Sequence, residues 1–524
     1  MFTLGCAALA VVATWIATRH GPGMSPDSVT YLSAARNLAA GHGYADFTGQ
    51  ALTTFPPGYP ALVAVLHVLG LSIATGARLV NAVSFGAVVL LAGVLIRRHT
   101  SSRAVTLGAT ALVAVSPALI NIASTAWSET LFSALVLAFL LALEDGIAPG
   151  TPARALGAAG VLAGLAFLVR YAGLSLLAVG ALTIAAGAYR HGLRTVARRL
   201  GVFLGAGSVL PGLWILRNAA SGSRFLLGPR VAAPESWRSF LDRFLGGVQG
   251  LFTPGGSIGN VAVVAVVLGV AALGLSAALT PHRTRRGTWW RSRLMPLVAY
   301  VVVYSGVVIS AGKTAGASVD QRIAAPVYVP ALILVVTLVD RLAVRAQAGG
   351  SQRRWVASAP AFALVAVLAY GGSSAVAFAS QAWNDGRTPR GYTRQNSDRF
   401  QLVNSVETLS RRALVATNRP WTLFEATGRE PIVASPGQVA PELALIPILV
   451  SQLASQSCTR PVYLAWFRSA AQWPFTPAQL SADLDLDLVQ QLRDGALYSV
   501  QPKVPDCPRP LAAARQDTPD PGSS

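Results

Sequence analysis

A long succession of apolar segments limits the folds that are open to this chain. The first segment, residues 2–18, is apolar for about 17 positions, close to the lower length limit for a membrane-spanning helix. Further segments lie at approximately 78–96, 104–121, 127–143, 154–170, 171–188, 200–216, 259–280, 294–311, 323–340 and 355–379. The sequence therefore predicts a mainly α fold, a polytopic transmembrane helical bundle of about 11 spans.

The composition agrees with a membrane protein. Hydrophobic residues make up 53% of the chain and charged residues 12%, against about 25% charged in soluble domains. The net charge of +20 could suggest nucleic-acid binding, but the arginines concentrate in short loops between apolar segments. Basic residues in such loops set the topology of a membrane protein. We therefore expect membrane lipids as partners and no nucleic acid.

The distribution of arginine also predicts the orientation. If the N-terminus lies inside, four of the five predicted inner loops are basic, and only the loop around Arg154 carries a single arginine. An odd number of spans then places the C-terminal part outside. We predict a multi-pass protein of the cytoplasmic (inner) membrane with an extracytoplasmic C-terminal domain.

The C-terminal part differs in character from the rest. After a polar stretch, short β-like runs alternate with helix-like runs, which is typical of a small α/β domain. The predicted strands are 413–418, 431–435, 461–467 and 496–500, and the predicted helices are 398–410, 421–427, 441–456 and 476–492. We therefore predict three parts: a transmembrane domain (1–380), an α/β domain (381–507) and a disordered tail (508–524).

Two cysteines lie in the exported part of this topology. Cys458 and Cys507 could form a disulfide, because disulfides persist in oxidising compartments. Two unpaired thiols are an equal alternative.

The first outer loop, residues 19–60, is too patterned to be a spacer. It holds an early carboxylate, Asp27, then a helix-like run, a Gly-rich turn and the sequence Pro-Pro-Gly-Tyr-Pro. The apolar run 60–72 is too short to span, so we expect interfacial helices here. A carboxylate near an apolar wall tends to have a raised pKa, which suits a general base. The alternative is that Asp27 is only a helix N-cap. Tyr31 is a further candidate for substrate binding.

A second carboxylate, Glu129, lies at the predicted outer mouth of a helix. An acidic residue at membrane depth is costly unless it caps, pairs or functions, and a structural role and a functional role are both open. Glu129 could tune the pKa of Asp27 or bind a sugar.

The predicted outer side also carries cations. Arg170, Arg217, Lys313 and Arg322 lie there, against the usual charge bias. Such donors could bind a phosphate at the membrane surface, and the alternative is that they extend to lipid headgroups. No pair of histidines has metal-ligand spacing with a carboxylate, so we expect no metal site and no cofactor.

These motifs together resemble a known family. The sequences PDSVTYLSAARNLAAGHGY and FPPGYPAL, followed in order by AWSETLF, LVRYAGL, WILRN and DQRIAAPVYVP, are similar to the polyprenyl-phosphate-sugar-dependent glycosyltransferases of the C-type membrane fold. This superfamily includes protein O-mannosyltransferases and aminoarabinose transferases. The resemblance spans residues 1–380, and the run VATNRPWTLFEATGRE extends it more weakly into the C-terminal domain.

The resemblance implies an inverting, single-displacement transfer from a polyprenyl-phosphate sugar to a hydroxyl of a glycan, lipid or protein. Asp27 matches the catalytic aspartate of the family and Glu129 its second acidic position. Arg217 and Arg322 match the residues that would stabilise the leaving phosphate, with Lys313 and Arg170 as further donors. Thr54-Phe55 stands where aminoarabinose transferases have a lysine before the two prolines, which weakens aminoarabinose as the donor sugar.

Two other classes of function compete with the transferase. A flippase for a lipid-linked sugar would usually show repeated halves and broken mid-membrane helices, and the sequence shows neither. A non-catalytic envelope scaffold would bind glycans through the C-terminal domain and would not depend on Asp27.

Overall fold

The computed structural model describes residues 1–188, 192–221, 236–252, 285–315, 321–347, 391, 400–433, 445–468 and 476–503. The predicted spans 259–280 and 355–379, Cys507 and the tail 508–524 lie outside these residues. Contacts divide the chain into two compact units. Unit 1 comprises 1–44 and 51–388, and unit 2 comprises 45–50 and 389–524, so a short piece of the first outer loop belongs to unit 2.

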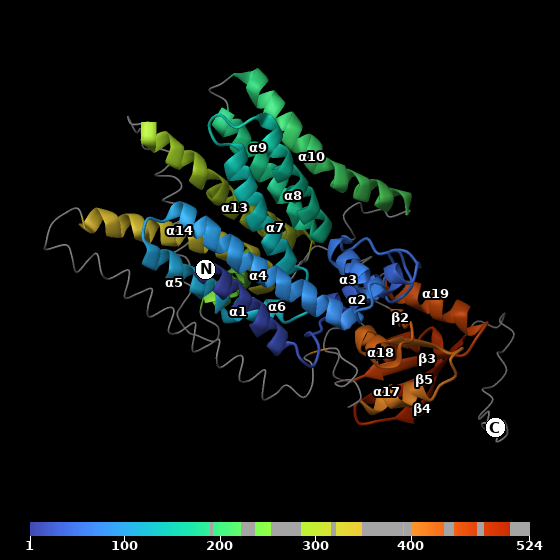
Figure 1. Cartoon of the computed structure of the whole chain (residues 1–524). Helices are drawn as coiled ribbons and strands as arrows, with labels where there is room; N and C mark the ends of the chain where they lie inside the picture. The colour runs from blue at the N-terminus through green and yellow to red at the C-terminus, as the bar shows by residue number, and fades with distance from the viewer. Residues whose placement is uncertain are drawn as a thin grey trace. The chain divides into compact units, whose positions relative to one another are not determined.

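Unit 1 is helical (Figure 1). Its α-helices are α1 (Phe2–Ala17), α2 (Pro26–Ala39), α3 (Gly58–Val68), α4 (Ile73–His99), α5 (Arg103–Ala114), α6 (Pro117–Ala123), α7 (Glu129–Gly146), α8 (Leu156–Val169), α9 (Leu174–Ala188), α10 (Leu193–Ala220), α11 (Trp237–Phe252), α13 (Arg285–Ala315) and α14 (Gln321–Gln347). Two short 3-10 helices, η1 (Ala153–Ala155) and η2 (Tyr171–Gly173), precede α8 and α9.

The helices agree with the predicted membrane bundle. Every predicted span within the described residues coincides with a helix, although 104–121 is divided into α5 and α6, which meet at 43°. Within those residues, five helices are long and apolar enough to cross a membrane, or six if the bent pair is one span. The total of about eleven spans stays a prediction.

Small residues let α8 and α10 approach closely. A Cβ on Gly160 of α8 would lie 2.4 Å from the carbonyl oxygen of Phe203 on α10, and one on Gly164 would lie 3.0 Å from the carbonyl oxygen of Gly207. The Gly-x-x-x-Gly spacing is typical of helix contacts in membranes, where van der Waals packing replaces the hydrophobic effect. An alanine at Gly160 would force the two helices apart.

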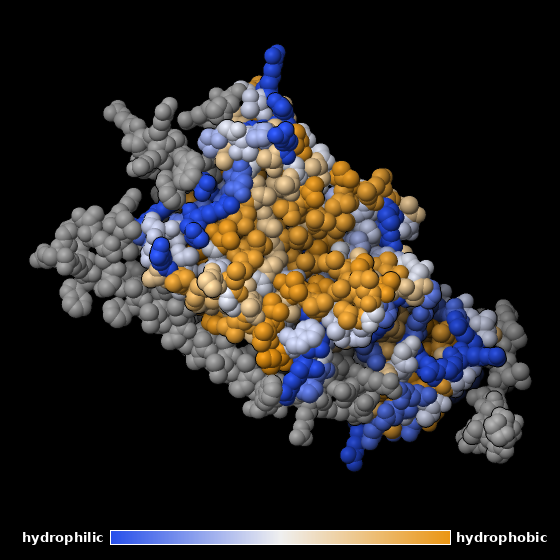
Figure 2. Space-filling view, viewed as in Figure 1, coloured by the Kyte–Doolittle hydropathy of each residue, from blue (hydrophilic) through white to orange (hydrophobic). Residues whose placement is uncertain are grey.

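The face of unit 1 that Figure 2 shows has a broad apolar area. Large hydrophobic side chains are exposed along α10 at Val209, Leu213 and Leu216, and along α1 at Leu9 and Val12. A soluble monomer seldom exposes so large an apolar area, whereas a bilayer covers it.

Unit 2 contains a mixed five-stranded sheet. Its elements are α17 (Gln401–Glu407), β1 (Leu414–Thr417), α18 (Pro420–Thr427), β2 (Ile432–Val433), α19 (Leu445–Ser457), β3 (Val462–Phe467), α20 (Pro477–Leu480), β4 (Leu484–Gln491) and β5 (Gly495–Pro502). The strand order is β2-β1-β3-β5-β4, with β2, β1 and β3 parallel and β5 antiparallel to both β3 and β4.

Successive residues of these strands point to opposite faces of the sheet. Val415 and Ala465 pack into one core with helices α17 and α18, while Ala416 and Leu464 pack into a second core with α19. The sheet is therefore covered on both faces at β1 and β3, whereas the edge strand β4 is mostly exposed.

The predicted helix 476–492 is wrong. Only the four residues of α20 are helical there, and β4 follows. The run Leu-Asp-Leu-Asp-Leu alternates apolar and polar residues with the period of a strand, so Leu484 is buried while Asp485 and Asp487 are exposed. Cys458 of this unit is disulfide-bonded.

Candidate active site

Asp27 lies in the first turn of α2. The side chain of Ser25 caps this helix by accepting a hydrogen bond from the Ser28 amide at 3.2 Å, and Pro26 supplies the first helical residue. The hypothesis that Asp27 is the N-cap is therefore wrong, because Ser25 has that role. The carboxylate of Asp27 stays available for contacts beyond its own helix, and its side chain is 27% exposed.

Glu129 is the first residue of α7, and its side chain is 1% exposed. The chain ahead of α7 is joined to the chain ahead of α2 by a short parallel bridge. In this bridge the Gly23 amide donates to the Ser124 carbonyl at 2.8 Å, and the Ala126 amide donates to the Gly23 carbonyl at 2.9 Å. Backbone pairing therefore brings the first turns of two helices together, and each of these turns carries a carboxylate.

Two arginines meet these carboxylates. Arg170, which follows α8, places its Nη1 atom 2.7 Å from Glu129 Oε1. Arg322, in the first turn of α14, pairs with Asp27 and places its Nε atom 3.4 Å from the same Glu129 oxygen. The structure thus brings four predicted site residues into one charged cluster whose formal charges balance.

Tyr31 joins the same cluster. Its hydroxyl lies 3.2 Å from Ser128 Oγ, and that oxygen accepts a hydrogen bond from Arg170 Nη1 at 3.0 Å. The rings of Phe55 and Tyr59 pack against the Tyr31 ring. Burial, together with the nearby carboxylates, raises the pKa of Tyr31 far above its ordinary value, so the hydroxyl stays protonated.

Arg217 and Lys313 have different surroundings. Arg217 donates to the Tyr44 carbonyl at 3.0 Å and to the Leu52 carbonyl at 2.9 Å, and its guanidinium lies over the ring of Trp214. Arg217 therefore joins α10 to two residues of the outer loop that belong, like itself, to unit 1. Lys313 Nζ lies 5.1 Å from the centre of the Trp237 ring on α11.

Sequence reasoning missed two residues that organise the cluster. Trp127 lies with its ring beside the guanidinium of Arg322 and donates its indole N–H to Ser25, and Ser128 joins Tyr31 to Arg170. Both precede Glu129 directly in the motif AWSETLF. The sequence signal that could have identified them is their position directly before the candidate carboxylate Glu129.

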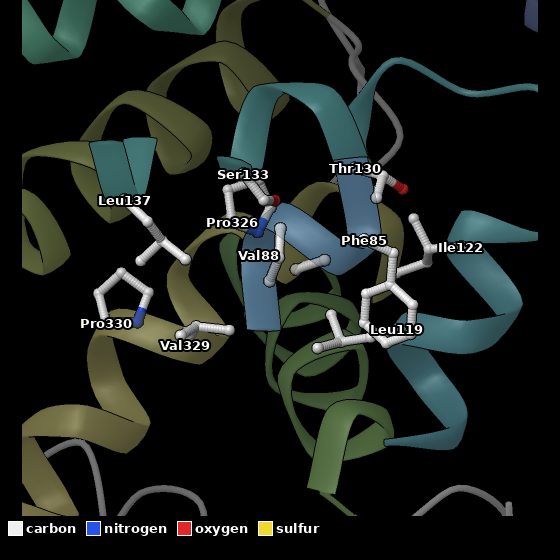
Figure 3. Close-up of a pocket in the computed structure, with 11 residues that line it drawn as sticks. Phe85, Val88, Leu119, Ile122, Thr130, Ser133, Leu137, Pro326, Val329 and Pro330 are labelled. Atoms are coloured by element: carbon white, nitrogen blue, oxygen red, sulfur yellow. The ribbon is translucent and has the colours of Figure 1, made fainter. Parts of the chain in front are cut away.

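An apolar pocket lies between α4, α6, α7 and α14 (Figure 3). Its lining residues Thr130 and Pro326 follow Glu129 and Arg322 of the charged cluster closely in sequence. Thr130 and Ser133 of α7 line it together with Pro326 and Pro330 of α14. Its volume is about 10 Å³, which is room for roughly one water molecule. Within the described part of the chain, no group of three His, Cys, Asp or Glu residues could hold a metal ion.

Comparisons with protein-family models and with curated proteins found no match. Comparison with solved structures found several. ArnT from Cupriavidus metallidurans, bound to undecaprenyl phosphate, matches with a TM-score of 0.53 and 16% identity over 94% of this chain and 97% of that protein.

Two further structures show the same likeness. The archaeal oligosaccharyltransferase AglB from Archaeoglobus fulgidus, in complex with an inhibitory peptide and a dolichol-phosphate, matches with a TM-score of 0.51 and 13% identity over 88% of this chain and 69% of that one. The arabinofuranosyltransferase AftD from mycobacteria matches with a TM-score of 0.51 and 17% identity over 95% of this chain, which spans 41% of AftD. The chain therefore has the C-type glycosyltransferase membrane fold that its motifs predicted.

Proposed function

We propose that this chain is an integral-membrane, inverting glycosyltransferase. It moves a sugar from a polyprenyl-phosphate donor to a hydroxyl acceptor on the extracytoplasmic face of the cytoplasmic membrane. The observation that carries the proposal is the cluster of Asp27, Glu129, Arg170 and Arg322, which combines a partly exposed carboxylate with cations suited to a phosphate. The fold supports it, since ArnT was solved with undecaprenyl phosphate and AglB with a dolichol-phosphate.

The transfer is a single displacement. The acceptor oxygen attacks the anomeric carbon from the side opposite the phosphate, so a new carbon–oxygen bond forms as the bond to the phosphate oxygen breaks. Asp27 takes the proton of the acceptor hydroxyl as general base. The polyprenyl phosphate leaves with the bonding electrons, and Arg322 and Arg170 stabilise its charge.

Arg322 changes partner during this cycle. Its guanidinium pairs with Asp27, and this contact would hold the base away from an acceptor hydroxyl. The donor phosphate is an oxyanion that a guanidinium binds with two parallel hydrogen bonds, so it competes with Asp27 for Arg322. Donor binding thereby frees the base, and the enzyme gains its active arrangement only when its substrate is present.

Glu129 has a separate role. Its Oε1 atom lies within ion-pair distance of both arginines, and within the described residues both carboxylate oxygens are buried without a hydrogen-bond partner. A buried acceptor without a donor is costly, and a sugar hydroxyl would satisfy it. We assign Glu129 to anchoring the arginines and accepting a hydrogen bond from the substrate, and Arg217 to supporting the outer loop.

The test uses purified full-length protein in detergent. It is given polyprenyl-phosphate-linked hexoses and pentoses with a membrane glycolipid fraction as acceptor, and released polyprenyl phosphate is measured by mass spectrometry. We expect release with transfer, inverted anomeric configuration in the product, and loss of at least about a thousandfold in Asp27→Asn. A folded Asp27→Asn variant with full turnover would overturn the mechanism. Movement of the lipid across proteoliposomes without transfer would overturn the function.

A further inference from the structure

The geometry points to Trp127 as a positioning residue that fixes Asp27 and Arg322 relative to each other. This inference rests on the proposed function and adds a residue to it. Trp127 lies in the turn between α6 and α7, and its side chain reaches two different elements. Its ring centre is 4.9 Å from the guanidinium carbon of Arg322, while its indole N–H donates to Ser25 Oγ at 2.7 Å.

The indole N–H contacts the N-cap of the helix that carries Asp27, and the indole ring contacts Arg322. Ser25 is the N-cap of α2, two residues before Asp27, so the hydrogen bond fixes the start of the helix that carries the base. The aromatic face attracts the Arg322 cation, which lies over it. One rigid side chain therefore spans the distance between the base and its ion-pair partner.

The backbone around Trp127 makes this brace stiff. The parallel bridge between Gly23 and Thr125 holds the turn against the chain ahead of α2. The side chain of Asn81 on α4 donates to the Thr125 carbonyl. Because the turn is held on both sides, movement of the indole would have to move α2 or Arg322 with it.

This arrangement matters most after the donor has bound. Once a phosphate has taken Arg322 from Asp27, the direct ion pair no longer fixes the carboxylate. The hydrogen bond from Trp127 to Ser25 then remains, together with the Gly23–Thr125 bridge, to keep the base within reach of the acceptor hydroxyl. A small error in that position slows the chemical step and leaves donor binding nearly unchanged.

The test compares Trp127→Phe with Ser25→Gly and with the double variant. Phenylalanine keeps a smaller ring beside Arg322 and removes the N–H donor, and glycine keeps most of the capping stability. We expect each single variant to lower kcat about tenfold with donor KM within about twofold, and the double variant to be no slower than either. Trp15→Phe is the control, since Trp15 also lies beside an arginine, Arg78, at 4.1 Å from its ring centre.

The outcomes separate the two proposals. An inactive wild-type protein would overturn the proposed function. An active wild type in which Trp127→Phe matches Trp15→Phe, or in which the two single losses multiply in the double variant, would overturn the positioning role alone. If Trp127→Phe does not fold, Ser25→Gly decides, because it breaks the same hydrogen bond from the other side.

Discussion

Replacing Asp27 by asparagine should abolish transfer and yet tighten the binding of the lipid phosphate. Arg322 pairs with Asp27, so a phosphate that needs this guanidinium must first displace the carboxylate. Asparagine has no charge, so it binds the Arg322 guanidinium more weakly and competes less with the phosphate. The same substitution removes a negative charge that would repel the phosphate, so both effects act in the same direction.

The solvent exposure of the Asp27–Arg322 pair sets the size of the expected change in Kd. The side chain of Arg322 is 13% exposed and that of Asp27 is 27% exposed, so the pair is neither a surface pair nor a fully buried one. Surface pairs contribute up to about 1 kcal/mol, and removing one partner of a buried pair costs about 3–5 kcal/mol. We take about 1–2 kcal/mol for the freed interaction, which corresponds to a Kd about five to thirty times lower.

The assay is a titration of purified protein with polyprenyl phosphate in detergent. Wild type and Asp27→Asn are compared with Asp145→Asn, which neutralises an aspartate paired with Arg98 at 2.7 Å near the C-terminal end of α7, away from the cluster. The control should bind like wild type. Unchanged or weaker binding by Asp27→Asn would refute the exchange of Arg322 between carboxylate and phosphate.

Three further predictions follow from the same contacts. Glu129→Gln should lower the free energy of unfolding by about 3 kcal/mol, because Arg170 loses a buried counter-ion; denaturant titration measures it, and a change under 1 kcal/mol would contradict the argument. Arg217→Lys should slow turnover about tenfold, since one ammonium does not reproduce a fork that reaches two carbonyls; full turnover in a steady-state assay would count against it. Tyr31→Phe should slow turnover about fivefold without moving the alkaline limb of the pH profile, because burial raises the pKa of Tyr31 beyond that range; a moved limb would show that Tyr31 ionises there.

Much of the fold follows from hydrophobic length and loop charge. The apolar segments predicted the helices because a bilayer requires long apolar runs, and this signal does not depend on tertiary contacts. The same topology put Asp27, Glu129, Arg170 and Arg322 at helix ends on one side of the membrane. Their convergence in a single cluster then needs only that the helices pack together.

The remaining details depend on contacts that the sequence does not encode locally. Ser25 and Asp27 are both good N-caps, and only the structure shows which one accepts the amide hydrogen bond. Arg217 and Arg322 both lie at the end of a helix, but one reaches carbonyls of the outer loop and the other reaches carboxylates. In β4 the alternation of leucine and aspartate is itself a local signal for a strand, and it outweighs the helical pattern predicted for 476–492.

The division of the outer loop between two units affects the order in which parts of this protein can fold during synthesis. Residues 45–50 belong to unit 2, where the ring of Phe47 packs against Phe424 at 5.4 Å between ring centres. A ribosome reaches the rest of that unit about 340 residues later, which at about 5–20 residues per second takes on the order of half a minute. During that time Phe47 lacks the Phe424 ring that it packs against in the folded protein. The loop that carries Asp27 is therefore synthesised early, and part of it completes its packing late.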